Sequence, residues 1–382
     1  MKKILIIALI IISGLFIIII NGYKKIDNNL LSVYLDNERV ESIPDRGKGT
    51  YLKSVCDDEN IKTEWNNDNW GLFVSGLSKK VKCNIYFSSD VEKPSWQVDS
   101  VSRNVLTTDI YTVRLIGSDN SKVSPNLNID DIKFLVSNCD YAPIKKDLEI
   151  IESSDNKIIY ELKIHMLKGE GKLVLRINSG TLKDDSGNES NSTDLDTGIT
   201  IAKNNNTKIL ILKDYSNVTK NSISGYYSNL VIDGTLTFDE IVKAKYDVVI
   251  YYNPYWDGST VLNTLYNAGV NIISQYNNYT DGLIINGAGN VMSKNDYVYV
   301  DKVLNSSITR YFDDRFAEDD DYISLWHFNS KATILYQVTY ENETFDKIGY
   351  LKENDNIWFN IGVNNSLNYV PIIEFVMGRL EE

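Results

Sequence analysis

Three patterns of apolar and polar positions follow one another along the 382 residues of the chain. The first is a continuous apolar run from Ile4 to Ile20, which only Ser13 and Gly14 interrupt. The second consists of short alternating runs, separated by turn-forming residues, and reaches to about residue 202. The third follows three asparagines at 204–206 and alternates strand patterns with helix patterns. We therefore predict a multidomain protein with an N-terminal span, two all-β modules and a C-terminal α/β domain.

The apolar run predicts a transmembrane helix. Its seventeen residues are at the short end for a membrane-spanning helix and slightly long for the core of a signal peptide. We interpret residues 1–25 as an uncleaved signal anchor, with a cleaved signal peptide as the alternative. Lysines lie on both sides of the run, but the short N-terminal tail should stay inside, so either interpretation exports the rest of the chain. The predicted location is the cell membrane, crossed once, with the remaining domains extracellular.

Residues 28–90 are predicted to form a small β module, because short alternating runs at 31–35, 70–74 and 81–87 are separated by turn formers. Cys56 ends one strand-like run and Cys83 lies within another. A domain of about sixty residues has a core of marginal stability, so a disulfide would stabilise it. We expect Cys56 and Cys83 to be linked, and two buried free thiols are the alternative.

The same module carries a recognisable order of residues: Val55-Cys56-Asp57, Trp65, Trp70, Leu72, Val74, Leu77-Ser78-Lys79 and Lys82-Cys83-Asn84. This order resembles small β repeats in surface proteins of low-GC Gram-positive bacteria. The resemblance implies a spacer or stalk, since no activity is associated with such repeats.

Residues 94–202 are predicted to form a β-sandwich, because strand patterns recur at 111–116, 132–136, 158–164 and 172–177 with turn signals between them. The segment 171–188 contains the full turn Gly-Thr-Leu-Lys-Asp-Asp-Ser-Gly-Asn and resembles the closing strands of bacterial immunoglobulin-like domains. The resemblance implies an immunoglobulin-like fold for this module.

Three further residue sets in this module are interpreted as structural. Asp184, Asp185 and Asn188 could ligate calcium, but a turn whose side chains bond the local backbone is the interpretation that we favour. Cys139 has no expected partner and is predicted to be a small buried apolar residue. His165 lies in an alternating run and is interpreted as a strand or surface residue, not as a ligand.

Residues 205–382 are predicted to form an α/β domain. Strand patterns at 208–213, 246–252 and 270–274 alternate with helix patterns at 237–242 and 260–267. Thr237 and Glu240 have the spacing of a capping box at the start of the first helix. This order predicts a three-layer domain with a mostly parallel sheet, closed by a final helix at about 370–380.

Four stretches of this domain, 246–250, 267–269, 270–274 and 357–362, resemble the class I glutamine-amidotransferase-like fold, in particular its ThuA-like branch. The resemblance implies a nucleophilic cysteine after the strand that 270–274 would occupy, with a histidine and a glutamate later. The chain departs from this pattern, because no cysteine follows Cys139 and Ser274 has no Gly-x-Ser-x-Gly setting. We therefore expect a degenerate domain with no catalytic residue.

Polar and aromatic residues directly follow two of the predicted parallel strands, where open α/β sheets bind their ligands. The candidate ligand-binding residues are Asn253, Tyr255, Trp256, Asp257, Gln275, Tyr276 and Asn277. Amide groups and aromatic rings together suit sugars or peptides, and covering the end of the sheet is the structural alternative. An acidic cluster also precedes His327: Asp313, Asp314, Glu318, Asp319, Asp320 and Asp321. It could serve metal binding or acid–base chemistry, but such runs more often form a solvated loop.

Composition narrows the function. A net charge of −13 argues against a nucleic-acid partner, and two histidines make a histidine-based metal centre improbable, so we expect no metal and no cofactor. Abundant Ile, Asn, Lys and Tyr indicate an AT-rich genome, as in a low-GC bacterium or its phage. We predict a non-catalytic surface protein, anchored in the bacterial membrane, whose degenerate domain binds a glycan or another envelope or extracellular ligand. The alternative is a carbohydrate-acting hydrolase that uses carboxylates of the C-terminal domain.

Overall fold

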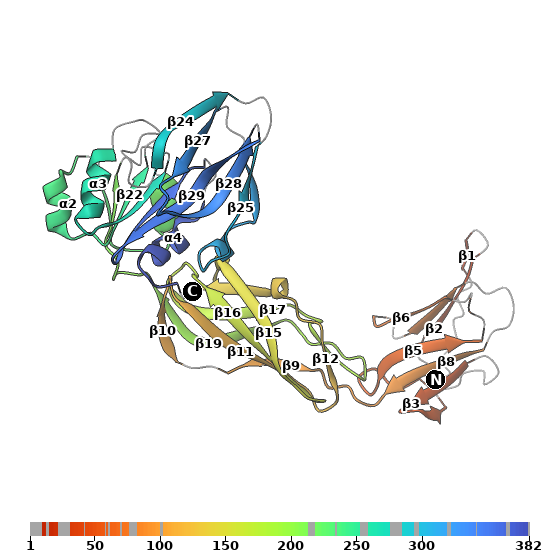
Figure 1. Ribbon diagram of the computed structural model, residues 1–382. Helices are drawn as coiled ribbons and strands as arrows, with labels where there is room; N and C mark the ends of the chain where they lie inside the picture. The colour runs from red at the N-terminus through yellow and green to blue at the C-terminus, as the bar shows by residue number, and fades with distance from the viewer. Residues whose placement is uncertain are drawn as a thin grey trace.

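Three modules lie in space in the order of the sequence: a small β module, a β-sandwich and a C-terminal domain (Figure 1). The computed structural model describes residues 10–12, 15–21, 31–41, 43–57, 59, 62–68, 71–75, 82–99, 102–212, 218–233, 235–252, 259–275, 285–293, 298–318, 322–340, 342–363 and 367–380. Strands predominate among these residues. The predicted fold class is wrong in two respects, the N-terminal span and the mostly parallel C-terminal sheet.

The predicted transmembrane helix over residues 1–25 is wrong. β1 (Ile10–Ile12) and β2 (Leu15–Asn21) are strands, and β2 pairs antiparallel with β7 (Gly71–Ser75). In the part of the chain that the structure describes, no helix is long and apolar enough to cross a membrane. The run is rich in isoleucine, whose β-branched side chain favours a strand when a neighbouring strand offers hydrogen bonds. The signal anchor and the single-pass location with extracellular domains depended on this helix and are corrected with it. The membrane as a partner stays a prediction.

A four-stranded sheet forms the centre of the small β module. Its order is β4 (Glu38–Val40), β3 (Leu31–Leu35), β8 (Cys83–Ser88) and β5 (Thr50–Cys56). β3 and β8 are parallel, and the other pairs are antiparallel. A second sheet contains β6 (Lys62–Asn66), β7, β2 and β1. Val33, Ile85 and Phe87 are each at most 1% exposed and lie in a small apolar cluster.

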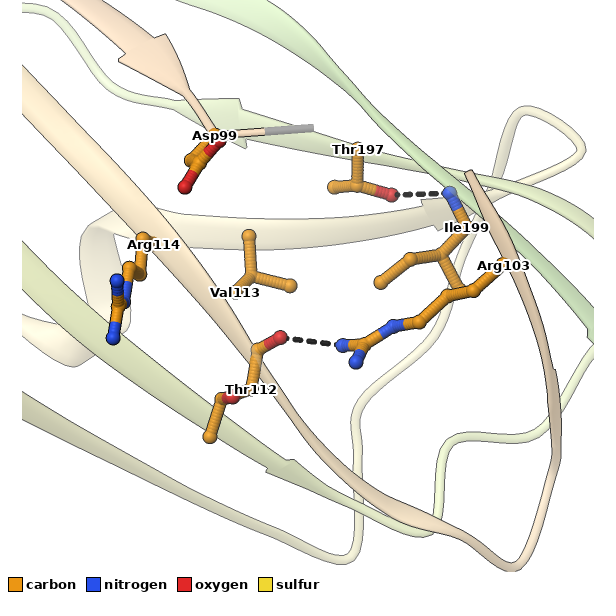
Figure 2. A pocket seen from close by; sticks show the side chains of 7 residues that line it. All are labelled: Asp99, Arg103, Thr112, Val113, Arg114, Thr197 and Ile199. Atoms are coloured by element: carbon orange, nitrogen blue, oxygen red, sulfur yellow. Dashed lines mark hydrogen bonds between the residues drawn. The ribbon is translucent and has the colours of Figure 1, made fainter. Parts of the chain in front are cut away.

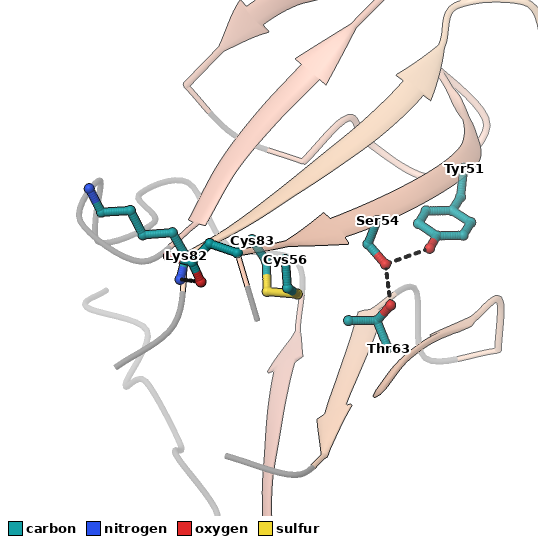
Figure 3. Close-up of a disulfide and its surroundings, with 7 residues drawn as sticks. Tyr51, Ser54, Cys56, Thr63, Lys82 and Cys83 are labelled. Carbon is teal, nitrogen blue, oxygen red and sulfur yellow. Dashed lines mark hydrogen bonds between the residues drawn. A yellow bond between two sulfur atoms is a disulfide. The ribbon is translucent and has the colours of Figure 1, made fainter. Parts of the chain in front are cut away.

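A disulfide joins Cys56 at the end of β5 to Cys83 at the start of β8 (Figure 3). This is the pair that the sequence indicated, and the two residues are direct partners in the antiparallel ladder. Beside it, the Ser54 hydroxyl donates to Thr63 Oγ1 over 2.5 Å and lies 2.9 Å from the Tyr51 hydroxyl. These contacts connect β5 with β6, so covalent and polar links reinforce a module with a small core.

The sandwich consists of two sheets packed face to face. One has the order β15 (Lys145–Ser153), β16 (Lys157–His165), β11 (Ile110–Ser118), β9 (Ser95–Val98), and the other β10 (Arg103–Leu106), β19 (Thr193–Ala202), β17 (Gly171–Ile177), β13 (Ile132–Val136), β14 (Cys139–Asp140). Leu115, Leu162 and Leu175 are fully buried between the sheets. Cys139 is exposed, contrary to the prediction, because β14 is a two-residue edge strand.

The C-terminal domain contains a nine-stranded mixed sheet, so the predicted three-layer α/β domain with a mostly parallel sheet is wrong. Its order is β21 (Leu230–Ile232), β20 (Ile209–Leu212), β22 (Val248–Tyr252), β23 (Asn271–Gln275), β30 (Asn356–Ile361), β29 (Glu343–Glu353), β28 (Thr333–Tyr340), β25 (Val298–Lys302), β26 (Arg315–Glu318). Pairing is parallel from β21 to β30 and antiparallel beyond it. The reason is local: β28, β29 and β30 are joined by two-residue turns, at which Asn342 and Asn354 have positive φ, and such turns permit only antiparallel pairing.

Four described helices pack mainly on the parallel half of this sheet. α2 (Phe238–Ala244) and α3 (Ser259–Asn267) cover one face, and α1 (Val218–Ile223) and α4 (Tyr369–Val376) cover the other. α2 begins at the predicted capping box, in which the Glu240 amide donates to Thr237 Oγ1 and the Glu240 carboxylate accepts from the Thr237 amide. A separate ribbon pairs β24 (Ile285–Ser293) with β27 (Tyr322–Phe328).

Candidate functional site

The predicted binding edge lies at the carboxyl ends of β22 and β23. Tyr252 and Gln275 are the last residues of these strands and are direct partners in the parallel register. The last described residues before Asn253 and Tyr276 are therefore direct neighbours. Six of the seven candidates lie outside the described residues: Asn253, Tyr255, Trp256, Asp257, Tyr276 and Asn277. Their ligand-binding role stays a prediction.

Gln275, the seventh candidate, is 5% exposed and bonded within the domain. Its Nε2 donates to the carbonyl oxygen of Val363 over 3.1 Å, and its Oε1 accepts from the Tyr369 hydroxyl. The amide thus connects the end of β23 with the chain beyond β30 and with the first residue of α4. In this position Gln275 fixes the edge from which the candidate segments start.

Ser274 occupies the strand end where the amidotransferase resemblance implies a nucleophile nearby. Its hydroxyl is fully buried, donates to Asn360 Oδ1 over 3.0 Å and accepts from Trp358 Nε1 over 2.8 Å. Both hydrogen-bonding directions of the oxygen are therefore used inside the domain. Ser274 contributes to a polar contact between β23 and β30 and not to an open surface.

The acidic cluster and His327 do not come together in the described part of the domain. His327 is exposed and its ring stacks on Phe345, with 5.2 Å between ring centroids. Asp314 forms an ion pair with Lys302. Asp319, Asp320 and Asp321 lie outside the described residues. Among the described carboxylates none lies within 4.0 Å of a His327 ring nitrogen, which is the pairing that an acid–base site would need.

The turn from Asp184 to Asn188 has the structure of a side-chain-bonded turn. Asp184 Oδ1 accepts from the Asn188 amide and Oδ2 accepts from Asn188 Nδ2, both over 2.7 Å. Gly187, with φ of 87°, allows the chain to reverse between them. The same turn contacts the small β module, because Asn188 Oδ1 accepts from the Thr50 hydroxyl over 2.6 Å and Ser186 and Ser88 hydroxyls lie 2.9 Å apart.

Two distant aspartates join this turn, which the sequence did not suggest. One carboxylate oxygen each of Asp90, Asp119 and Asp184 lie within 4.8 Å of one another. Burial raises the pKa of Asp184, hydrogen bonds from Asn188 oppose this, and the neighbouring Asp119 and Asp90 carboxylates raise the pKa further. These three residues could hold a divalent cation, since Ca²⁺ prefers carboxylate oxygens. Each also accepts a hydrogen bond from the protein, Asp119 from Ser121 and Asp90 from the Glu92 amide.

A groove of about 240 Å³ opens on the sandwich where β9 ends and β10 begins (Figure 2). It is lined by Asp99, Arg103, Thr112, Val113, Arg114, Thr197 and Ile199. Arg103 Nη2 donates to the carbonyl oxygen of Thr112 over 2.5 Å, so the guanidinium covers the open edge of β11. Two cationic side chains and one carboxylate share the lining, and this mixed charge defines no single class of ligand.

The sandwich and the C-terminal domain meet at a buried junction. The Thr107 hydroxyl donates to the carbonyl oxygen of Tyr226 over 2.5 Å, and the Asn204 amide donates to the same oxygen over 2.8 Å. The Ser228 amide donates back to the carbonyl oxygen of Asn204 over 3.0 Å. Thr107 and Asn204 are fully buried, so these hydrogen bonds belong to a packed interface and not to a flexible linker.

Met166 connects the two cores at this junction. Its side chain is fully buried in the apolar cluster of the C-terminal domain, which also holds Ile223 and Ile308, whereas Leu167 belongs to the core of the sandwich. Met166 has φ of 56°, the left-handed region, and this backbone turn sends successive side chains into different modules. His165, a strand residue as expected, lies fully buried at the same place.

Comparisons with known proteins show only distant similarity. No family model and no curated protein matches the chain. A structure described as part of a GMP synthase from Thermoplasma acidophilum has a TM-score of 0.31 at 9% identity, covering 46% of this chain and 96% of that one. A glutamine amidotransferase from Thermotoga maritima has a TM-score of 0.30 at 9% identity, covering 46% and 83%.

Similarity to immunoglobulin domains is weaker still. A structure of three immunoglobulin domains of titin has a TM-score of 0.20 at 11% identity, covering 52% of this chain and 65% of that one. The chain is thus distantly similar to amidotransferase-like and immunoglobulin structures, and at these TM-scores the likeness carries no argument about function.

Proposed function

We propose that the protein is a non-catalytic binding protein, in which the sandwich holds the C-terminal domain in a fixed orientation and the carboxyl edge of β22 and β23 binds a glycan. The register between Tyr252 and Gln275 carries the proposal, because it makes the strand ends that precede the two candidate segments direct neighbours. Aromatic rings and amides at one edge suit a sugar, whose apolar face stacks on a ring while its hydroxyls bond to amides.

Two further observations support the proposal. One favours a binding role over a catalytic role, and the other favours a fixed orientation of the two modules over a flexible linker. Ser274 and Gln275 are buried and bonded internally at the strand end where a nucleophile would be needed. The junction built by Thr107, Asn204 and Met166 buries polar and apolar groups together, which favours one orientation of the two modules.

A glycan array that includes peptidoglycan fragments, probed with the full chain, tests the proposal. Titration calorimetry on the retained glycans should show at least tenfold weaker binding for Trp256→Ala. Tyr299→Ala is the matched control, because Tyr299 is 52% exposed on β25, in the antiparallel half of the sheet. The control should bind as the wild type does. Absence of any retained glycan, or an equal loss in both variants, would overturn the proposal.

A further inference from the structure

His165 is enclosed between the two modules. It ends β16 of the sandwich and is 1% exposed. Its Nδ1 lies 2.9 Å from the hydroxyl of Tyr311, which belongs to η2 (Thr309–Tyr311) of the C-terminal domain. Its Nε2 lies 3.3 Å from Asp147 Oδ2 but, within the described residues, has no aligned hydrogen bond. The imidazole is therefore removed from water by the docking of the two modules.

The surroundings of His165 disfavour a positive charge. Asp147 of the sandwich and Tyr311 of the C-terminal domain contact the ring, and the charges of Lys145 and Lys163 in the sandwich and of Arg310 in the C-terminal domain act on it. Burial is the largest cause that lowers the pKa of His165, to about 4; Asp147 raises the pKa, and the three cations lower it again. The Asp147 carboxylate is 42% exposed, so water weakens its attraction for the ring.

The hydrogen bond to Tyr311 also disfavours protonation of His165. A neutral imidazole can accept the Tyr311 hydroxyl hydrogen at Nδ1, whereas an imidazolium carries a hydrogen on both nitrogens. Protonation would therefore place two donors against each other unless the Tyr311 hydroxyl turns away. In separated modules, water would solvate both groups and no such conflict would exist.

From this geometry we infer that the junction is an acid-sensitive contact, closed while the His165 imidazole is neutral and opened by its protonation. An exposed histidine takes up a proton near pH 6.5. Since the docked form resists that proton and the open form accepts it, docking should weaken about tenfold per pH unit from about pH 6.5 down to about pH 4. The inference concerns the orientation of the modules and does not depend on the proposed glycan binding.

Proton NMR on the full chain tests the first step. The chain has two histidines, so His327→Gln assigns both imidazole signals. When the pH of the wild type is lowered from neutral, the chemical shift of the His165 imidazole should stay constant until well below pH 6. Titration of His165 near pH 6.5 while the junction is closed would overturn the inference.

Small-angle scattering tests the second step, with samples between pH 7.5 and pH 4.5. The radius of gyration of the wild type should rise on acidification while near-ultraviolet circular dichroism keeps the signal of folded modules. His165→Gln, which takes up no proton, should remove most of this rise, and His327→Gln should behave as the wild type. Identical pH profiles for the wild type and His165→Gln would overturn the inference. If His165→Gln does not dock at pH 7.5, the histidine titration in the wild type decides alone.

Discussion

Met166→Ala should separate the stability of the C-terminal domain from that of the sandwich. The Met166 side chain is fully buried in the core of the C-terminal domain although the residue belongs to the chain of the sandwich. Truncating a buried methionine to alanine removes its contacts and leaves a cavity, at a cost of about 2–5 kcal/mol. Because the lost contacts are those between modules, we expect one cooperative urea transition of the two modules in the wild type to become two in the variant.

Met166→Gly makes the prediction sharper. It removes the same side chain but relieves the left-handed backbone at φ of 56°, which costs a residue with a Cβ about 1–2 kcal/mol. Glycine is ordinarily less stable than alanine by about 0.5–1 kcal/mol. The two effects oppose each other, so Met166→Gly should be at least as stable as Met166→Ala.

Urea unfolding followed by circular dichroism and by tryptophan fluorescence measures both variants. Leu173→Ala is the matched control, because Leu173 is fully buried in the sandwich core alone. It should move the urea transition to a lower concentration without dividing it into two transitions. The reasoning fails if Met166→Ala costs less than about 1 kcal/mol, or if Met166→Gly is clearly the less stable of the pair.

Three other predictions concern a glycine, a disulfide and an aspartate. Gly349→Ala should cost about 3 kcal/mol, because an added Cβ would meet the Phe328 ring and, at 2.5 Å, the carbonyl oxygen of Thr333; Gly225→Ala, with its nearest contact at 3.5 Å, should change the melting temperature little. Replacing Cys56 and Cys83 by serine should lower the stability of the small module by about 2–4 kcal/mol in urea, and alkylation of both thiols without reductant would refute the link. The raised pKa of Asp184 means that the folded sandwich holds this proton more tightly than the unfolded chain, so stability should fall as pH rises from about 3.9 through the higher folded value. Asp184→Asn should flatten that slope, and an unchanged slope would contradict the assignment.

Local patterns predicted the elements whose cause is local. Leu173, Leu175 and Ile177 alternate in the sequence and are fully buried on one face of β17. Thr237 and Glu240 form the capping box that their spacing indicated. In each case the interaction joins residues within a few positions of one another, so the sequence contains all of its determinants.

Long-range partners decided the elements that the sequence did not predict. The isoleucine-rich run of β2 has the length of a short membrane helix, but its partner is β7, about fifty residues later in the chain. The two-residue turns at Asn342 and Asn354 were local signals for antiparallel pairing that could have corrected the sheet prediction. Asp119 approaches Asp184 because β12 (Val123–Pro125) pairs with β18 (Leu182–Asp184) inside the sandwich, and Asp90 approaches it from the chain that enters the sandwich from the small module. No spacing rule anticipates either approach.

The position of the candidate edge could be predicted from the sequence, but the surroundings of its residues could not. Adjacent parallel strands end at one side of a sheet, so the starting points of the two segments follow from the order of β22 and β23. Gln275 shows the limit of this reasoning. As the last residue of a strand it looked available to a ligand, but its amide bonds to Val363 and Tyr369, which lie 88 and 94 residues later.

Met166 and His165 are neighbours in the chain, yet they should control different properties of the same junction. Met166 contributes apolar burial, which does not change with pH. Its truncation should therefore lower the equilibrium constant for docking of the two modules by the same factor at every pH. His165 contributes the proton linkage, so His165→Gln should change the slope against pH and leave the neutral value nearly unaltered. The double variant should therefore show the lowered constant of one and the flat profile of the other. A slope that changed in Met166→Ala instead would mean that the proton enters through loosened packing and not through the ring between Tyr311 and Asp147.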